Sequence, residues 1–363
     1  MKYLLFIGPG IGDFFMAVHV ARRIKLADEQ AYITVFSRNN SHRVKLQKEL
    51  LQLQSWIDDV YYYSLKELGC NINLIFNLLK MRYDYSFRVC YVDSKRVSGW
   101  PNKIMRLVSK CSLGTSISGR EDLKYDLSIK FDKNGNFYSF YGDLLSKIGI
   151  NHIQNELEYG LFNSKNCFLK KECYYINIIK TFEQSKVIAF FVGSEAIPVS
   201  ADRKSETKKS KRWPISYWDK LFLRLIEHGY CLLLLGNSEE YEEYKNIIAL
   251  KNKNVFNLCG RTSLAESIYL VSNVSLVVGV DTGFMHCAGA IGTTSLTLFG
   301  CTSYKNYLPL SPKAYYIQSD EKCSPCFGTD RLAHCSDFHC MKKISVEEVY
   351  NKIISILGAN SGN

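Results

Sequence analysis

The chain has 363 residues, 47% hydrophobic and 22% charged, which is typical of a soluble globular protein with a sizeable core. This length predicts about two domains. No apolar run approaches the ~20 residues of a membrane span. The opening MKYLLFIGPGIGDFF lacks the layout of a signal peptide, so we expect a cytoplasmic protein.

The formal net charge is +11, and most of the excess lies in the N-terminal half. A basic half indicates an anionic partner such as a nucleic acid, an anionic lipid or a phosphorylated substrate. A surface tuned for solubility explains the charge equally well. The 13 cysteines are odd in number and lie mostly in apolar runs, as at Cys231, Cys259 and Cys287. They indicate reduced thiols and not a disulfide framework.

Two series of alternating strands and helices are visible, as expected for parallel sheets with crossover helices. The segment 95–135 shows no clear pattern. In the first series, strands are predicted at 2–8, 31–37, 60–64 and 85–92, and helices at 14–26, 41–54, 66–82 and 137–150. In the second series, strands are predicted at 187–194, 230–236, 255–260, 275–280 and 294–300, and helices at 215–229, 239–250, 263–273 and 346–357, with one more after the fourth strand.

The fold prediction is therefore α/β, with two doubly wound, Rossmann-like domains facing across a cleft. The N-terminal domain would span residues 1–170 and the C-terminal domain residues 185–343. Residues 344–363 would form a C-terminal helix and tail that pack back on the N-terminal domain. Ligands of such sheets bind at the carboxyl ends of the strands.

One corner of the second series indicates an anion site. The stretch GVDTGFMHCAGAIG, residues 279–292, places Asp281, Thr282 and Gly283 between a buried strand and a small-residue helix. A helix N-terminus favours a phosphate, the Thr282 hydroxyl adds a donor, and His286 lies one turn further along. Simple helix capping by Asp281 or Thr282 is the alternative.

A basic segment, RKSETKKSKR at 203–212, follows the strand at 187–194. It belongs to the same sheet edge as the corner if the strands are parallel. One residue separates Lys211 from Trp213-Pro214, where the next helix begins. Lys211 is predicted to reach a diphosphate held by the corner. Most of the segment is interpreted as solvated charge.

Three carboxylates also lie at the predicted carboxyl ends of strands. Asp13, in GIGDFF, begins the first helix and is a candidate general base. Glu239 and Glu240 follow LLLLGNS and are candidates for binding the hydroxyls of a ribose. For all three, helix capping or a favourable helix-dipole position is the alternative. The GPGIG segment does not match the dinucleotide fingerprint, because Asp13 stands where its last glycine belongs.

Together, these segments resemble glycosyltransferase family 9, the lipopolysaccharide heptosyltransferases, over nearly the whole chain. The resemblance rests on G-I-G-D, K-R-W-P, G-x-x-E-E, V-D-T-G-x-x-H, L-F-G-x-T, and the cysteine motifs S-P-C-F and H-C-M. It implies a GT-B fold in which the N-terminal domain binds the acceptor and the C-terminal domain binds the nucleotide sugar. It also implies an inverting, metal-independent transfer of heptose from ADP-heptose to the inner core of lipopolysaccharide. The implied partners are this donor and an anionic core acceptor, with contact to the cytoplasmic face of the inner membrane.

The resemblance also implies roles for single residues. Asp13 would be the general base and Lys211 would neutralise the donor phosphates. Gly12 and His19 would contact the acceptor. The donor site would comprise Ser194, Lys211, Glu239, Glu240, Asp281, Thr282, Gly283 and His286. Two positions depart from the family pattern: His19 replaces a frequent proline, and F-G-P-T reads here with Cys301 in place of proline.

The cysteines Cys323, Cys326, Cys335 and Cys340 have the spacing C-x2-C-x8-C-x4-C. Four such thiols predict a structural zinc or iron site without a catalytic role. A loop with free, locally packed cysteines is the alternative. No cofactor is expected to be required for catalysis.

Three other functions are alternatives. The first is an enzyme that transfers heptose to a protein, or transfers another sugar. The second is a protein that binds a nucleotide sugar without turnover, and the presence of Asp13 and Lys211 argues against it. Nucleic-acid binding is not expected, because the run at 203–212 lacks interleaved aromatic residues.

Overall fold

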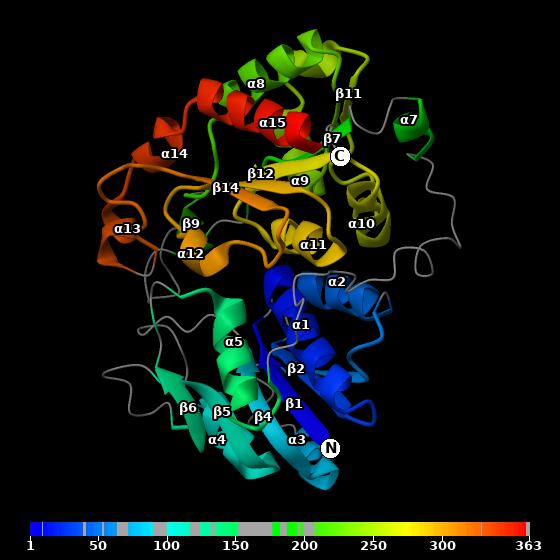
Figure 1. Ribbon diagram of the computed structural model, residues 1–363, viewed down its shortest axis with the longest axis vertical. Coiled ribbons are helices and arrows are strands. Elements are labelled where there is room, and N and C mark those ends of the chain that lie inside the picture. The colour runs from blue at the N-terminus through cyan, green and yellow to red at the C-terminus, as the bar shows by residue number, and fades with distance from the viewer. Residues whose placement is uncertain are drawn as a thin grey trace. The chain divides into compact units, whose positions relative to one another are not determined.

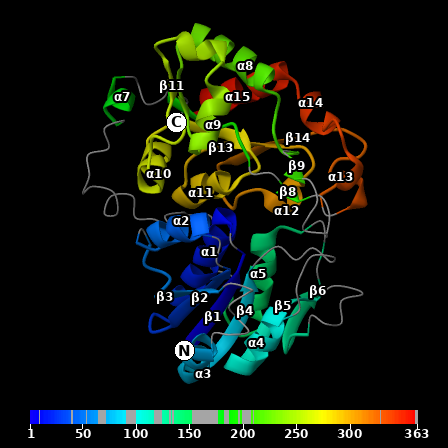
Figure 2. The same cartoon turned by 180° about the vertical axis from the view of Figure 1, so that it is seen from behind.

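The computed structural model divides the chain into two compact units, Met1–Glu156 and Leu157–Asn363 (Figure 1). Each unit contains a six-stranded parallel sheet flanked by helices (Figures 1 and 2), which confirms the predicted α/β class with two doubly wound sheets. The structure describes residues 1–8, 10–38, 41–52, 54–63, 72–89, 100–116, 124–130, 132, 135–151, 176–181, 187–194, 197–198, 207–208, 210–327 and 329–360. The predicted junction near 160–185 falls largely outside them.

The first unit has the strand order β3-β2-β1-β4-β5-β6. Residues of β1 alternate between the two faces of the sheet, and Leu4 and Phe6 pack with α3 and α4 through Leu78 and Met105. The elements of this unit are β1 (Lys2–Ile7), α1 (Ile11–Ala27), β2 (Tyr32–Arg38), α2 (Ser41–Gln52), β3 (Asp59–Tyr63), α3 (Ile72–Met81), β4 (Tyr83–Val89), α4 (Trp100–Val108), β5 (Ser109–Ser116), β6 (Leu127–Lys130) and α5 (Phe137–Ser146).

The second unit has the strand order β11-β10-β7-β12-β13-β14, and all five strand pairs are parallel. Its elements are α7 (Ile176–Lys180), β7 (Val187–Phe191), α8 (Ile215–Glu227), β10 (Cys231–Leu234), α9 (Ser238–Tyr244), a 3₁₀ helix (Ile248–Lys251), β11 (Val255–Asn257), α10 (Leu264–Ser272), β12 (Leu276–Val280), α11 (Gly283–Ile291), β13 (Ser295–Phe299), α12 (Tyr304–Tyr307), β14 (Ala314–Gln318), α13 (Asp330–His334), α14 (His339–Lys343) and α15 (Val346–Asn360). A two-stranded antiparallel pair, β8 (Ile197–Pro198) and β9 (Thr207–Lys208), lies apart from the sheet.

Helices of the second unit begin and end where local chemistry dictates. Ser263 and Glu266 form a capping box at the start of α10. Gly292 ends α11 in the left-handed region, at φ 84°, which favours glycine. On β7, Ile188 and Phe190 face one hydrophobic core and the alternate residues face the other.

The C-terminal helix α15 packs against α8, and Ile353 is fully buried in the core of the second unit. Its predicted return to the N-terminal domain stays a prediction. Among the described residues, no helix combines the length and apolar character that crossing a membrane requires. The described cysteines are free, and Cys231, Cys259 and Cys287 are buried, as predicted.

Candidate donor site at the strand ends of the second unit

The corner after β12 leaves a helix N-terminus uncapped. Asp281 follows the strand and is 5% exposed. Thr282 is the N-cap residue of α11, but its side chain makes no capping hydrogen bond. Its Oγ1 atom is buried without a hydrogen-bond partner among the described residues. The corner therefore has the features of an anion site: a free hydroxyl beside the first-turn amides of a helix.

Lys211 lies at this corner. Its Nζ atom is 2.6 Å from Oδ2 of Asp281, and the two side chains are 19% and 6% exposed. The same nitrogen is 5.7 Å from the ring centroids of Tyr307 and Phe327. The end of the basic segment thus reaches the corner, whereas Arg203 to Glu206 and Lys209 lie outside the described residues.

The residues around Lys211 hold the segment in place. Ser210 is fully buried, with its Oγ atom 3.6 Å from Sγ of Cys301. Trp213 is 2% exposed, and its Nε1–H donates to the carbonyl oxygen of Ile344 at 2.9 Å. Because both neighbours are anchored, the position of Lys211 is set by packing.

Three hydroxyls without partners lie at the carboxyl ends of adjacent strands. Ser194 follows β7, Thr282 follows β12 and Thr302 follows β13. The Oγ atom of Ser194 and the Oγ1 atoms of both threonines are buried and have no hydrogen-bond partner within the described ranges. Leaving such a group unpaired costs about 1–3 kcal/mol, so each of these hydroxyls is a candidate donor to a ligand at this edge. Thr302 was not among the predicted residues; its place after L-F-G was the available signal.

His286 lies in the first turns of α11 and is 5% exposed. Burial lowers the pKa of this imidazole to about 4; Asp281 opposes the shift and Lys211 adds to it. The ring is therefore neutral at physiological pH. It can donate one hydrogen bond to an anion, but it brings no positive charge.

The two candidate ribose carboxylates differ sharply. Glu239 is exposed on the first turn of α9, whereas Glu240 is 8% exposed and turned inward. The backbone N–H of Asn237 donates to Oε2 of Glu240 at 2.9 Å, which completes a capping box. Glu240 therefore serves as a helix cap and also has the inward position that the ribose prediction requires.

In the first unit, Asp13 lies at the third position of α1, after the carboxyl end of β1. The backbone N–H of Gly10 donates to its Oδ2 atom at 3.1 Å. A Cβ atom on Gly8 would lie 2.2 Å from that oxygen, so glycine leaves room for the carboxylate. Capping, the alternative reading of Asp13, is thus observed, and a role as general base stays a prediction.

The two predicted acceptor residues differ in exposure. Gly12, in the first turn of α1, is partly exposed. His19 is 1% exposed, and its ring meets that of Tyr138 edge-on, with centroids 5.3 Å apart. Contact of His19 with an acceptor stays a prediction, and its described surroundings are those of a core residue.

The predicted metal-binding cysteines Cys323, Cys326, Cys335 and Cys340 line one cavity of about 300 Å³. Cys301, which follows β13, is a fifth thiol in its wall. Within the part of the chain that the structure describes, no three His, Cys, Asp or Glu side chains are grouped closely enough to hold a metal ion. Burial raises the pKa of Cys326 and Cys340 to about 12. Cys326 and Cys340 are buried, whereas Cys323 and Cys335 are partly exposed.

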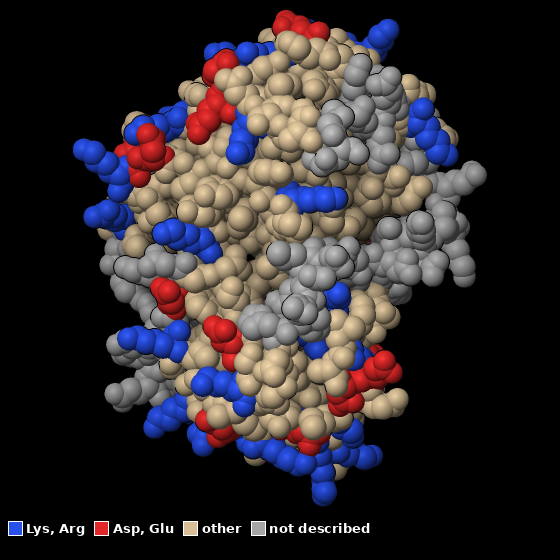
Figure 3. Space-filling model, viewed as in Figure 1, with Lys and Arg blue, Asp and Glu red and all other residues tan. Residues whose placement is uncertain are grey.

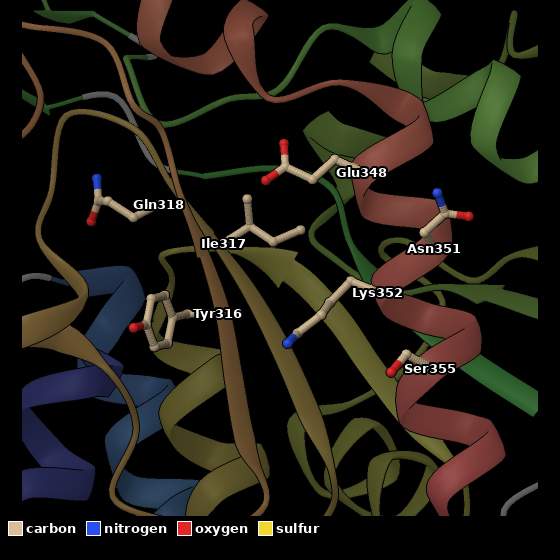
Figure 4. A pocket seen from close by; sticks show the side chains of 7 residues that line it. All are labelled: Tyr316, Ile317, Gln318, Glu348, Asn351, Lys352 and Ser355. Carbon is tan, nitrogen blue, oxygen red and sulfur yellow. The ribbon is translucent and has the colours of Figure 1, made fainter.

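A larger cavity, of about 530 Å³, lies between β14 and α15 (Figure 4). Its wall includes Tyr316, Gln318, Glu348 and Lys352. None of the predicted site residues belongs to it.

Known proteins resemble this chain in sequence and in fold. The model of the family "Glycosyltransferase family 9 (heptosyltransferase)" matches residues 195–336, which include the basic segment and the corner. This match confirms the resemblance predicted from the sequence. Lipooligosaccharide heptosyltransferase 2 of Haemophilus influenzae is 35% identical over 118 residues, covering 31% of this chain and 34% of that protein.

Lipopolysaccharide heptosyltransferase 2 of Escherichia coli is 29% identical over 152 residues, covering 41% of this chain and 40% of that protein. The matches thus span less than half the length of these curated relatives. The solved structure of the Escherichia coli ADP-heptose lipopolysaccharide heptosyltransferase II has a TM-score of 0.67 and 22% identity, covering 99% of this chain and 100% of that one. This likeness shows a shared fold.

Proposed function

Because residues 195–336 match glycosyltransferase family 9, we propose that the chain is a glycosyltransferase that moves heptose from ADP-heptose to the inner core of lipopolysaccharide. The observation that supports it most is the corner itself. There, Lys211 lies 2.6 Å from Asp281, beside the uncapped N-terminus of α11. The relatives' names, lipooligosaccharide and lipopolysaccharide heptosyltransferase, indicate the sugar and the acceptor class.

In this proposal the second unit binds the donor. The diphosphate accepts hydrogen bonds from the Thr282 hydroxyl and from the Gly283 amide at the positive end of α11. Lys211 turns from Asp281 toward the phosphates and offsets the negative charge that develops as the diphosphate leaves. His286 donates one hydrogen bond as a neutral imidazole. Glu240 accepts hydrogen bonds from the ribose, and Ser194 contributes its unpaired hydroxyl.

Asp13 is the proposed general base. An inverting transfer has a single displacement, in which the acceptor hydroxyl attacks the anomeric carbon and the diphosphate departs from the opposite face. The carboxylate must accept the hydroxyl proton during this step. The backbone N–H of Gly10 donates to Oδ2 and helps to orient the carboxylate. Gly12 and His19 are proposed to contact the acceptor.

Basic side chains of the first unit support an anionic partner. Exposed Lys2, Lys80, Arg82 and Lys110 lie near the starts of the neighbouring strands β1, β4 and β5. Figure 3 shows blue side chains gathered at this end of the unit. Asp84 pairs with Lys110 at 2.7 Å, so part of the charge is neutralised. We propose that this end approaches the anionic cytoplasmic face of the inner membrane.

A structural zinc or iron ion at Cys323, Cys326, Cys335 and Cys340 remains part of the proposal. Binding would require these side chains to converge and lose their protons. Elemental analysis of purified protein, next to the Cys326→Ser variant, tests it. One equivalent of metal that the variant lacks would support the site, and a metal content equal in both proteins would contradict it.

The function is tested by incubating the protein with ADP-heptose and a panel of truncated core acceptors, read by mass spectrometry. We expect one acceptor to gain the mass of one heptose. A gain only with a different nucleotide sugar would overturn the donor assignment. A gain only on a protein or peptide would overturn the acceptor, and binding without any gain would leave a nucleotide-sugar-binding protein.

A further inference from the structure

Arg212 joins two segments of the second unit that each contain a proposed donor residue. Its Nε and Nη2 atoms donate to the carbonyl oxygen of Ser194, at 3.0 and 2.9 Å. Its Nη1 atom donates to the carboxylate of Glu243 on α9. Nη2 also lies 3.9 Å from Oε1 of Glu240. One guanidinium thus connects the end of β7 with α9.

The carboxylate of Glu240 occupies a space that only glycines leave open. A Cβ atom on Gly193 would lie 1.6 Å from its Oε1, and a Cβ atom on Gly236 would lie 2.2 Å from its Oε2. These glycines follow β7 and β10, which are neighbours in the sheet. Glu240 is therefore wedged between two strand ends, with Asn237 holding Oε2 and Arg212 facing Oε1.

We propose that Arg212 is a positioning residue for donor binding: it holds the carboxylate of Glu240, through charge and through the Ser194 carbonyl, in the orientation that accepts the ribose hydroxyls. This inference rests on the proposed function. It adds a residue, Arg212, that does not touch the donor itself but sets how well Glu240 binds the donor ribose.

Two features distinguish this arrangement from an ordinary surface ion pair. The side chain of Arg212 is only 18% exposed and the side chain of Glu240 only 11% exposed, so solvent screens the pair weakly. The guanidinium uses a fixed fork of donors to reach a carbonyl and two carboxylates at once, and a lysine ammonium cannot reproduce this geometry. One positive charge faces the carboxylates of both Glu240 and Glu243.

The test compares two nucleotides on matched variants. Isothermal titration calorimetry gives the Kd of ADP and of 2′,3′-dideoxy-ADP, which lacks the ribose hydroxyls. The proteins are wild type, Arg212→Gln, Arg212→Lys and the control Arg261→Gln. Arg261 is a fair control. Its guanidinium donates a hydrogen bond to the hydroxyl of Tyr241, at 2.6 Å, on α9, the helix that contains Glu240. It does not contact Glu240 in any described interaction. Thermal melting verifies folding. If Arg212→Gln does not fold, the comparison uses Arg212→Lys alone.

Wild type and the control should prefer ADP over the dideoxy analogue by about 10- to 100-fold, as expected for hydrogen bonds to a charged group. The Arg212 variants should lose most of this preference while binding the dideoxy analogue about as well as wild type. An equal loss of affinity for both nucleotides, or an unchanged preference, would overturn the inference.

The outcome also separates this inference from the proposed function. If UDP or GDP binds instead of ADP, the same comparison is made with its dideoxy analogue. A ribose preference that depends on Arg212 would then support the inference while the donor assignment fails. Heptose transfer with a preference that Arg212 does not affect would support the function and overturn the inference. Binding of no nucleotide would overturn both.

Discussion

The ammonium nitrogen of Lys211 lies 2.6 Å from Oδ2 of Asp281, although 70 positions separate the two residues along the chain. The partner is almost wholly buried, and the lysine is shielded by the rings of Tyr307 and Phe327. Without a ligand, each charge neutralises the other. In the proposed function, a diphosphate at the corner competes with Asp281 for this ammonium group.

Replacing Lys211 with alanine should reduce the rate of sugar transfer by about 100-fold or more, the range observed when one stabilising group is removed from a developing anion. The rate is measured by product mass under saturating donor. Lys220→Ala, at an exposed position of α8, is the control and should retain activity. Equal activity of the two variants would remove Lys211 from the mechanism.

Replacing Thr282 with valine should weaken ADP binding by about tenfold while changing the free energy of unfolding by no more than about 0.5 kcal/mol. The reason is that the hydroxyl has no partner among the described residues and makes no capping hydrogen bond. Calorimetry and urea unfolding measure the two quantities. Thr282→Ser should restore binding. A valine variant that unfolds easily would instead identify the hydroxyl as structural.

The stability of the second unit should fall as the pH drops from about 6.5 toward 4. Burial lowers the pKa of His286 to about 4 in the folded chain, from an ordinary value of 6.5, so the unfolded chain binds the extra proton first. The stabilisation is complete above pH 6.5 and is lost as the pH falls through the folded pKa. It amounts to at most about 3 kcal/mol.

Urea unfolding between pH 4 and pH 8 measures this dependence. His286→Gln should flatten it, whereas the exposed control His334→Gln should not. The two charged groups that face the imidazole, Asp281 and Lys211, are present in both variants, so their effects cancel in the comparison. An unchanged slope in His286→Gln would contradict the burial argument.

Replacing Ile353 with alanine should destabilise the second unit by about 3 kcal/mol, because the side chain is fully buried and its removal leaves a cavity. Ser355→Ala, at an exposed position of the same helix, should change the unfolding free energy by less than about 0.5 kcal/mol. Both values come from denaturant unfolding. Similar values for the two variants would show that α15 contributes little to this core.

Alkylation with iodoacetamide should label Cys323 and Cys335 before Cys231 and Cys259. The first two thiols are partly exposed, whereas burial raises the pKa of the other two to about 12 and excludes the reagent. Peptide mass mapping after short labelling times checks the order. Early labelling of Cys231 would contradict its place inside the sheet.

Much of the fold was predictable because long apolar runs mark central strands. The strand expected at 187–194 is β7, and the one expected at 275–280 is β12. In contrast, α4, β5 and β6 fall in the segment that gave no pattern. β5 reads SKCSLGTS, with a glycine and few apolar residues, and β6 is a four-residue edge strand with alternating exposure. An edge strand of the second sheet, β14, was missed as well; Tyr315 is partly exposed and Tyr316 is exposed.

The candidate site was predictable in its members but not in its contacts. The approach of Lys211 to Asp281 depends on the sheet order, which no local spacing encodes. Glu239 and Glu240 were indistinguishable, because both lie in a helix's first turn; the gap left by Gly193 and Gly236 decides which one turns inward. Arg212 was overlooked beside its neighbouring lysine, although its position directly before Trp-Pro was the same signal.

The antiparallel pair of β8 and β9 fixes the backbone shortly before Lys211. Pro198 pairs with Thr207 and Ile197 with Lys208, so the two ends of the intervening stretch are joined before the chain reaches Ser210. Thr207 and Lys208 precede Lys211 by only four and three positions, so a substitution that breaks this ladder should loosen the approach of Lys211 to the corner.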